Sequence, residues 1–111
     1  MVKYVKNFNI SFQRVKSFIE NNFLNISSSL SKEDEEIFSV NEISCALIVY
    51  ERYSFLGGNR VSLSVMIVGN SEASKVTMIT SGGSQAVFFK LNTIGEESFL
   101  DSAIKMLDNL K

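Results

Sequence analysis

Between Ile37 and Leu91 the sequence is a succession of strand-like segments, and the connections between them are short turns. Residues 60–68 (RVSLSVMIV) show the pattern most clearly, because aliphatic side chains occupy every second position. Turns of a few residues cannot hold the crossover that parallel strands need, so the sequence predicts an antiparallel sheet. The strands are expected at residues 43–54, 60–68, 75–81 and 84–91, with turns at 56–59, 69–72 and Gly82-Gly83.

The segments before this sheet are less regular. Residues 2–10 alternate loosely and predict a strand, whereas residues 11–24 have apolar side chains at helical spacing, with Ser11 as a suitable N-cap. Residues 26–30 alternate weakly and predict a short strand. The run KEDEE at 32–36 predicts a solvated turn; an acidic metal loop is the alternative, although it lacks the glycine of a calcium loop.

The C-terminal segment predicts an amphipathic helix. Thr93 and Glu96 stand three residues apart, as in a capping box, and Glu96 and Glu97 suit the positive end of the helix dipole. A continuous apolar stripe follows, formed by Phe99, Leu100, Ala103, Ile104, Leu107 and Leu110.

These elements predict one α+β domain over residues 1–111. We expect an antiparallel sheet of five to six strands in the order β-α-β-β-β-β(-β)-α, with two helices on one face. The sheet is the only surface against which both helices can bury their apolar sides. The order is similar to the helix-grip arrangement of TATA-binding-protein-like and Bet v 1-like folds, which implies a fold and no function.

Composition excludes several functional classes. The chain has no His, so it contains neither a Ser-His-Asp triad nor a histidine-ligated metal site. The chain has eleven Lys and Arg residues and twelve Asp and Glu residues. It therefore lacks the excess of basic residues that is typical of a general nucleic-acid binder. No apolar run reaches the roughly 18 residues of a membrane span. We therefore expect no enzyme activity, no cofactor, no nucleic acid and no membrane partner.

The cysteine content indicates the cellular compartment in which we expect the chain. Cys45 is the single cysteine and lies within the apolar run ISCALIVY, so a buried, unreactive thiol is expected. One cysteine cannot form an intramolecular disulfide, and the N-terminus lacks the apolar core of a signal peptide. These features favour the reducing cytoplasm.

The turn at 55–58 fixes a register for the central hairpin. With four residues in the connection, Tyr50 faces Leu63, Ile48 faces Val65 and Ala46 faces Ile67, which makes one sheet face aliphatic. The opposite face is also half apolar, and it carries Leu47, Val49 and Met66. Scattered apolar surface is ordinary, but a continuous patch is not. The leading hypothesis is a non-enzymatic protein that forms a homodimer through Leu47, Val49 and Met66.

A second hypothesis is a pocket for a small anionic ligand between the sheet and the C-terminal helix. Its polar rim would consist of two arginines and a glycine turn. The arginines could bind a carboxylate or phosphate through paired hydrogen bonds. The alternative is that Glu51, Arg60 and Lys90 form cross-strand ion pairs, and that the glycines only make a tight turn. The candidate ligand residues are Arg52, Arg60, Ser81, Gly82, Gly83 and Ser84.

Two stretches carry a family resemblance. ERYSFLGGNRVSLSV and ITSGGSQAVFFKLNTIGEESFL resemble a family of small uncharacterised bacterial proteins, mainly of the Firmicutes. The resemblance implies a stand-alone bacterial domain. It implies no activity, and no functional residue is carried over from it.

Overall fold

The computed structural model describes residues 2–54, 59–82 and 89–110. Two helices and five strands follow one another along the chain, with one short 3-10 helix after the first helix. They are β1 (Val2–Phe8), α1 (Phe12–Asn22), η1 (Phe23–Asn25), β2 (Leu30–Val40), β3 (Ile43–Ser54), β4 (Asn59–Gly69), β5 (Ser74–Gly82) and α2 (Phe89–Leu107).

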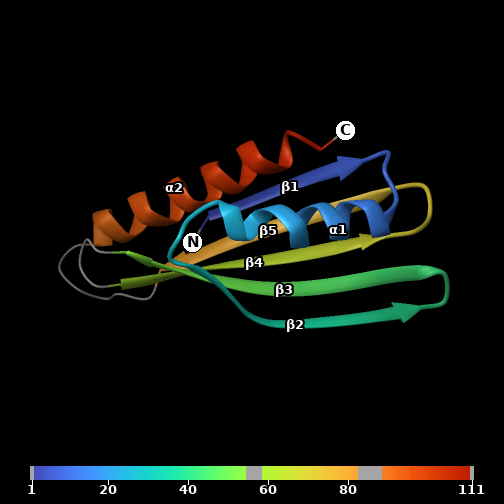
Figure 1. Ribbon diagram of the computed structural model, residues 1–111, viewed down its shortest axis with the longest axis horizontal. Coiled ribbons are helices and arrows are strands. Elements are labelled where there is room, and N and C mark those ends of the chain that lie inside the picture. Colours follow the sequence, from blue (N-terminus) through green and yellow to red (C-terminus); the bar gives the residue numbers. More distant parts are fainter. Residues whose placement is uncertain (1, 55–58, 83–88, 111) are drawn as a thin grey trace.

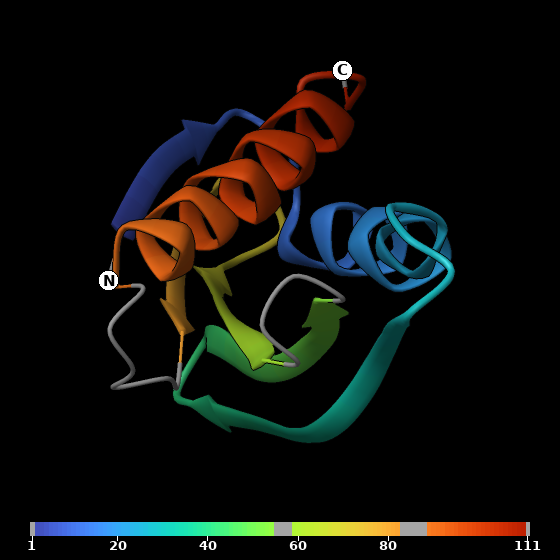
Figure 2. The ribbon, with the colours of Figure 1, turned by 90° about the vertical axis from the view of Figure 1, so that its left-hand side faces the viewer.

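The five strands form one antiparallel sheet in the order β1-β5-β4-β3-β2. Strand β1 pairs with β5, so the first strand of the chain lies beside the last one (Figure 1). Figure 2 shows that the sheet curls around α1 and α2, which both lie on its concave side. This confirms the predicted α+β class with two helices on one face, and the described residues form five strands.

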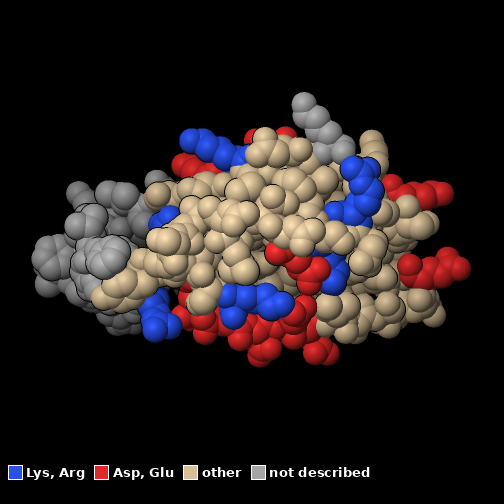
Figure 3. Space-filling view, viewed as in Figure 1, with Lys and Arg blue, Asp and Glu red and all other residues tan. Residues whose placement is uncertain are grey.

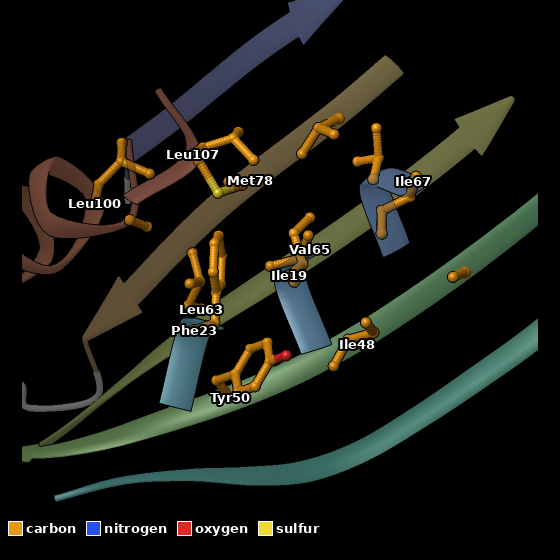
Figure 4. Close-up of a cluster of buried hydrophobic side chains, with 14 of the residues drawn as sticks. Ile19, Phe23, Ile48, Tyr50, Leu63, Val65, Ile67, Met78, Leu100 and Leu107 are labelled. Carbon is orange, nitrogen blue, oxygen red and sulfur yellow. The ribbon is translucent and has the colours of Figure 1, made fainter. Parts of the chain in front are cut away.

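The core lies between the concave sheet face and the two helices (Figure 4). Helix α1 contributes Phe12, Val15 and Ile19, and α2 contributes residues of the predicted apolar stripe. Burying each side chain of this size contributes about 1.5–3 kcal/mol, so the helices are held mainly by packing. The fully buried members from the sheet include Ile48, Tyr50, Leu63, Val65, Ile67 and Met78, and those from α2 include Phe99, Ala103 and Leu107.

Helix α1 begins where the sequence predicts. The backbone of Ser11 is extended, and its hydroxyl oxygen accepts a hydrogen bond from the backbone N–H of Arg14 at 3.2 Å. Such a cap satisfies an N–H group that the helix itself leaves unpaired. At the other end, the Asn22 side chain donates to the Phe18 carbonyl at 2.8 Å.

The β4–β5 turn fixes the start of α1. The side-chain oxygen of Asn70 accepts hydrogen bonds from the backbone N–H groups of Glu72 and Ala73, which closes the predicted turn. The Asn70 carbonyl then accepts from the Phe12 N–H at 2.9 Å. Gly69 is required here, because a Cβ at this position would lie 2.4 Å from the Ala73 carbonyl oxygen.

Two predictions for the segments before the central hairpin are wrong. The sequence predicts a strand at residues 26–30, but a turn follows η1 and β2 begins only at Leu30. The KEDEE run at 32–36 lies within β2 and is not a turn. An edge strand exposes most of its side chains, so it accommodates charges that a central strand would not. Pairing with β3, interrupted by a bulge between Lys32 and Asp34, keeps the segment extended.

The strand predicted at 84–91 is also corrected. Residues 84–88 lie outside the described residues, and Phe89 to Leu91 form the start of α2. Thr93 is therefore inside the helix and is not its cap. A short apolar run such as VFFKL is compatible with either a strand or a helix, because its periodicity does not distinguish them.

Candidate functional site

The register of the central hairpin decides which side chains face away from the helices. Tyr50 pairs with Leu63, Ile48 with Val65 and Ala46 with Ile67, which confirms the predicted register. These six residues are buried. Their neighbours along β3 and β4 must point to the opposite, convex side of the sheet. We call this side the outer face; its central residues are Cys45, Leu47, Val49, Ser64, Met66 and Val68.

Large apolar side chains are exposed across the outer face. Leu47 and Met66 are cross-strand partners and keep 39% and 46% of their surface exposed. On β2, Phe38 pairs with Cys45 and is 47% exposed. The exposed apolar residues of this face come from four strands and include Val5, Phe38, Val40, Ile43, Leu47, Tyr53 and Met66.

A shallow hollow of about 210 Å³ lies on the outer face beside β2. Leu47 and Val49 line its apolar part, and Asp34, Glu35 and Glu36 of β2 line its edge. Asp34 and Glu36 pair with Val49 and Leu47, so these two side chains belong to the outer face. Figure 3 shows acidic side chains gathered along the β2 edge of the molecule. The Asp34 carboxylate accepts a hydrogen bond from the Glu35 N–H at 2.8 Å. The hollow therefore combines an apolar floor with negative charge.

The sequence predicts the apolar residues of this site and misses the acidic ones. Leu47, Val49 and Met66 follow from their parity on the central hairpin. Asp34 and Glu36 fall in the predicted turn, because a run of five charged residues shows no alternation of apolar and polar side chains. Their position opposite Val49 and Leu47 follows only from the pairing of β2 with β3.

The two arginines proposed for an anionic ligand do not lie together. Arg52 lies on the helix-facing side, with its guanidinium 4.7 Å from the centre of the Phe99 ring. Burial there lowers the pKa of Arg52. Arg60 lies on the outer face, where its guanidinium donates to the Glu51 carboxylate at 3.0 Å. This hydrogen bond raises the pKa of Arg60.

Two of the four residues of the glycine turn, Ser81 and Gly82, lie in the described part of the chain. Ser81 lies beside Ser62, whose hydroxyl donates to the Ser81 carbonyl at 3.3 Å, and Gly82 pairs with Val61. Gly83 and Ser84 lie outside the described residues. The expected pairing of Glu51 with Arg60 is confirmed, whereas the joint rim of Arg52 and Arg60 is not formed because the sheet separates them.

Three further expectations concern the burial of the thiol, a metal site and a membrane-spanning segment. Cys45 is partly buried on the outer face, so the expectation of a fully buried thiol is wrong. Across residues 2–54, 59–82 and 89–110, no group of three or more acidic or cysteine side chains is placed to hold a metal ion. In the same ranges, no helix is long and apolar enough to cross a membrane.

Tyr50 is the most perturbed acid in the described part of the chain. It is 1% exposed, and its ring centre lies 5.9 Å from that of Phe23. Burial raises the pKa of Tyr50 to about 12, and the nearby carboxylates of Glu20 and Glu35 act in the same direction. Tyr50 is therefore a neutral core residue.

Comparison with known proteins relates the chain to one family. The profile of a family of unknown function, DUF6054, matches residues 1–111. No curated protein matches the chain. Among solved structures, the crystal structure of TTHA0849 from Thermus thermophilus is similar at a TM-score of 0.45 and 11% sequence identity. The match covers 97% of this chain and 94% of that one.

Proposed function

The chain belongs to DUF6054, a family of unknown function, and from the geometry of the outer face we propose that it acts by self-association as a homodimer. The observation that carries the proposal is the exposed apolar pair Leu47 and Met66 at the centre of this face. Val49 and Val68 flank the pair as partly buried neighbours. A soluble monomer rarely leaves a continuous apolar patch of several hundred Å² in water.

The size of the outer face supports a two-subunit contact. Strands β3, β4 and β5 have 9 to 12 residues each. At about 3.3 Å per residue and about 4.8 Å between strands, they present roughly 500 Å². Two copies would bury about 1,000 Å² in total, which is near the lower limit of specific interfaces. A dimer with a dissociation constant in the micromolar range is the expectation.

A binding role without catalysis agrees with the chemistry of this face. Its centre holds aliphatic side chains, a thioether and serines, and the chain has no His to act as a general base for them. We also propose the cytoplasm as its compartment, since the single partly buried Cys45 is suited to a reducing environment.

Placing one lysine in the centre of the face tests the proposal. We expect the wild-type chain to be a dimer at micromolar concentration by size-exclusion chromatography with light scattering. Val49→Lys should be a monomer, because the dimer would bury an unpaired ammonium group. Met66→Lys provides a second variant at a more exposed position, and thermal melting checks that both variants remain folded.

Leu24→Lys is the matched control. Leu24 is 46% exposed, like Met66, but it belongs to η1 and not to the outer face. This variant introduces the same charge and should remain a dimer. Dimers of Val49→Lys and Met66→Lys as stable as the wild-type dimer would exclude the outer face as the interface.

A further inference from the structure

Strand β2 is an edge of the sheet, and one of its two sides has no neighbouring strand. It pairs with β3 on one side, and no strand of residues 2–54, 59–82 and 89–110 pairs with the other. Figure 1 shows β2 at the lower margin of the molecule. An unpaired edge presents a row of backbone N–H and C=O groups with which another extended chain can pair.

The regular part of this edge is residues 34–40. A bulge between Lys32 and Asp34 interrupts the pairing with β3, and a bulge of this kind protects a sheet edge from further pairing. From Asp34 to Val40 the register is continuous. This stretch is as long as a typical strand of about 5–6 residues, so it can accept one more strand beside it.

The end of β2 exposes apolar side chains on both sides of the sheet. Ile37 pairs with the buried Ala46, so it points to the helix-facing side, where it is 47% exposed. Phe38 and Val40 point to the outer side, and Val40 is 60% exposed. A second outer face could cover only Phe38 and Val40. A strand added beside β2 would cover all three side chains.

The charges on the same stretch indicate the chemistry of such a strand. Asp34 and Glu36 share the outer side with Phe38 and Val40. Within the described residues, neither carboxylate takes part in an ion pair, whereas Glu35 on the other side pairs with Lys32. The edge thus has an acidic half followed by an apolar half. Opposite charges and β-branched side chains placed across from each other stabilise neighbouring strands.

From these observations we infer that the edge of β2 binds an extended segment of a partner protein, with β-branched residues in one half and Lys or Arg in the other. The added strand runs antiparallel to β2, because antiparallel pairing is slightly more stable per residue. Its apolar half therefore comes first, opposite residues 40 to 37, and its basic half follows, opposite residues 36 to 34. Main-chain hydrogen bonds supply affinity in this mode of recognition, and side chains supply specificity.

The other edge of the sheet, β1, lacks these features. Helix α2 packs against β1, and Lys3 and Lys6 give it the lysines that are typical of a protected edge. In the described part of the chain, β1 adds only Val5 to the exposed large apolar residues. A second copy of β2 is not complementary either, because it would bring another run of carboxylates beside the first.

A synthetic peptide tests the inference. The acetylated and amidated peptide VTVIKKK places its apolar half opposite residues 40 to 37 and its lysines opposite residues 36 to 34. Isothermal titration calorimetry should show saturable one-to-one binding to the wild-type chain. Hydrogen exchange of the backbone amides at residues 34–40 should become slower in the complex. Failure to bind, or binding that leaves these amides unprotected, would overturn the inference.

An exchange of charges tests the register. The variant D34K/E36K should bind VTVIKKK about tenfold more weakly or worse, because two attractive cross-strand pairs become repulsive. The peptide VTVIEKE should recover most of this loss on D34K/E36K. The matched control E72K/D101K makes the same charge change at exposed positions outside β2 and should bind VTVIKKK like the wild type. Equal weakening in the two double variants would show unspecific charge attraction and overturn the site.

Methylation of peptide nitrogens separates main-chain pairing from charge. Every second amide of an added strand points toward its neighbour, so methylating one alternate set in VTVIKKK should abolish binding and methylating the other set should not. Equal binding of the two methylated peptides would overturn strand addition.

The inference does not depend on the proposed homodimer, and one variant separates the two. Met66→Lys alters β4 on the outer face and leaves the edge of β2 unchanged, so it should bind VTVIKKK like the wild type whatever the state of association. Loss of peptide binding in Met66→Lys would assign the peptide to the outer face and overturn the edge site.

Discussion

Leu47 on β3 and Met66 on β4 are direct cross-strand partners at the centre of the sheet, and both are directed away from its helices. The residues on either side of each one along its strand, among them Ala46, Ile48, Val65 and Ile67, are completely or almost completely buried. The same hairpin thus supplies the floor of the core and an apolar outer surface. The outer face is therefore the surface through which we propose that the chain forms a homodimer.

The reactivity of Cys45 should report whether the outer face is covered. Cys45 is partly buried in one chain and lies next to the Leu47–Met66 pair. A partner subunit would cover its thiol, so we expect a thiol reagent to label Met66→Lys faster than the wild type. Leu24→Lys should label at the wild-type rate. Equal rates in all three proteins at concentrations above the dissociation constant would contradict a covered face.

Stability at alkaline pH should depend on Tyr50. Its pKa is raised to about 12 in the folded chain from an ordinary value of 10.0. The neutral phenol therefore favours the folded state fully below pH 10, and this contribution is lost as the pH rises from 10 through about 12. The loss amounts to roughly 2–3 kcal/mol.

The variant Tyr50→Phe isolates this contribution, because it keeps the ring and removes the ionising group. Urea unfolding between pH 9 and pH 12 should show a smaller loss of stability for Tyr50→Phe than for the wild type. Parallel losses in the two proteins would show that Tyr50 ionises as easily in the folded chain as in the unfolded one.

Helix α2 should depend on Leu107. This side chain is fully buried against the sheet, whereas Ile104 is only partly buried. Leu107→Ala should lower the free energy of unfolding by about 2–5 kcal/mol, since it removes buried methyl groups and leaves a cavity. The exposed Lys105→Ala is the control and should change little. Denaturant unfolding measures both, and equal stabilities would mean that α2 does not dock through Leu107.

The central hairpin could be predicted from the sequence because its geometry is local. A four-residue connection sets which residues of β3 and β4 face each other, and the alternation of aliphatic side chains sets which side is buried. The same reasoning already separates the two candidate arginines: Arg52 shares the parity of Tyr50, and Arg60 pairs with Tyr53 on the other face. A joint rim of Arg52 and Arg60 could thus have been excluded before the structure was known.

Two other segments, residues 32–36 and residues 89–91, could not be predicted in the same way. For β2, the charges at 32–36 favour a turn, and only the long-range pairing with β3 makes this segment a strand. Residues 89–91 belong to α2, and their short apolar run is compatible with either a strand or a helix, so its pattern does not decide between them. The acidic rim of the hollow depends on the first of these features, so the sequence alone does not reveal it.

The molar mass of the wild-type chain in solution is the most direct test of the proposed homodimer. Sedimentation equilibrium over a concentration series through the micromolar range should show a reversible association from 12.4 kDa to about 25 kDa, twice the mass of one chain. A constant mass of 12.4 kDa up to several hundred micromolar would contradict the homodimer, because the outer face would then remain exposed to water.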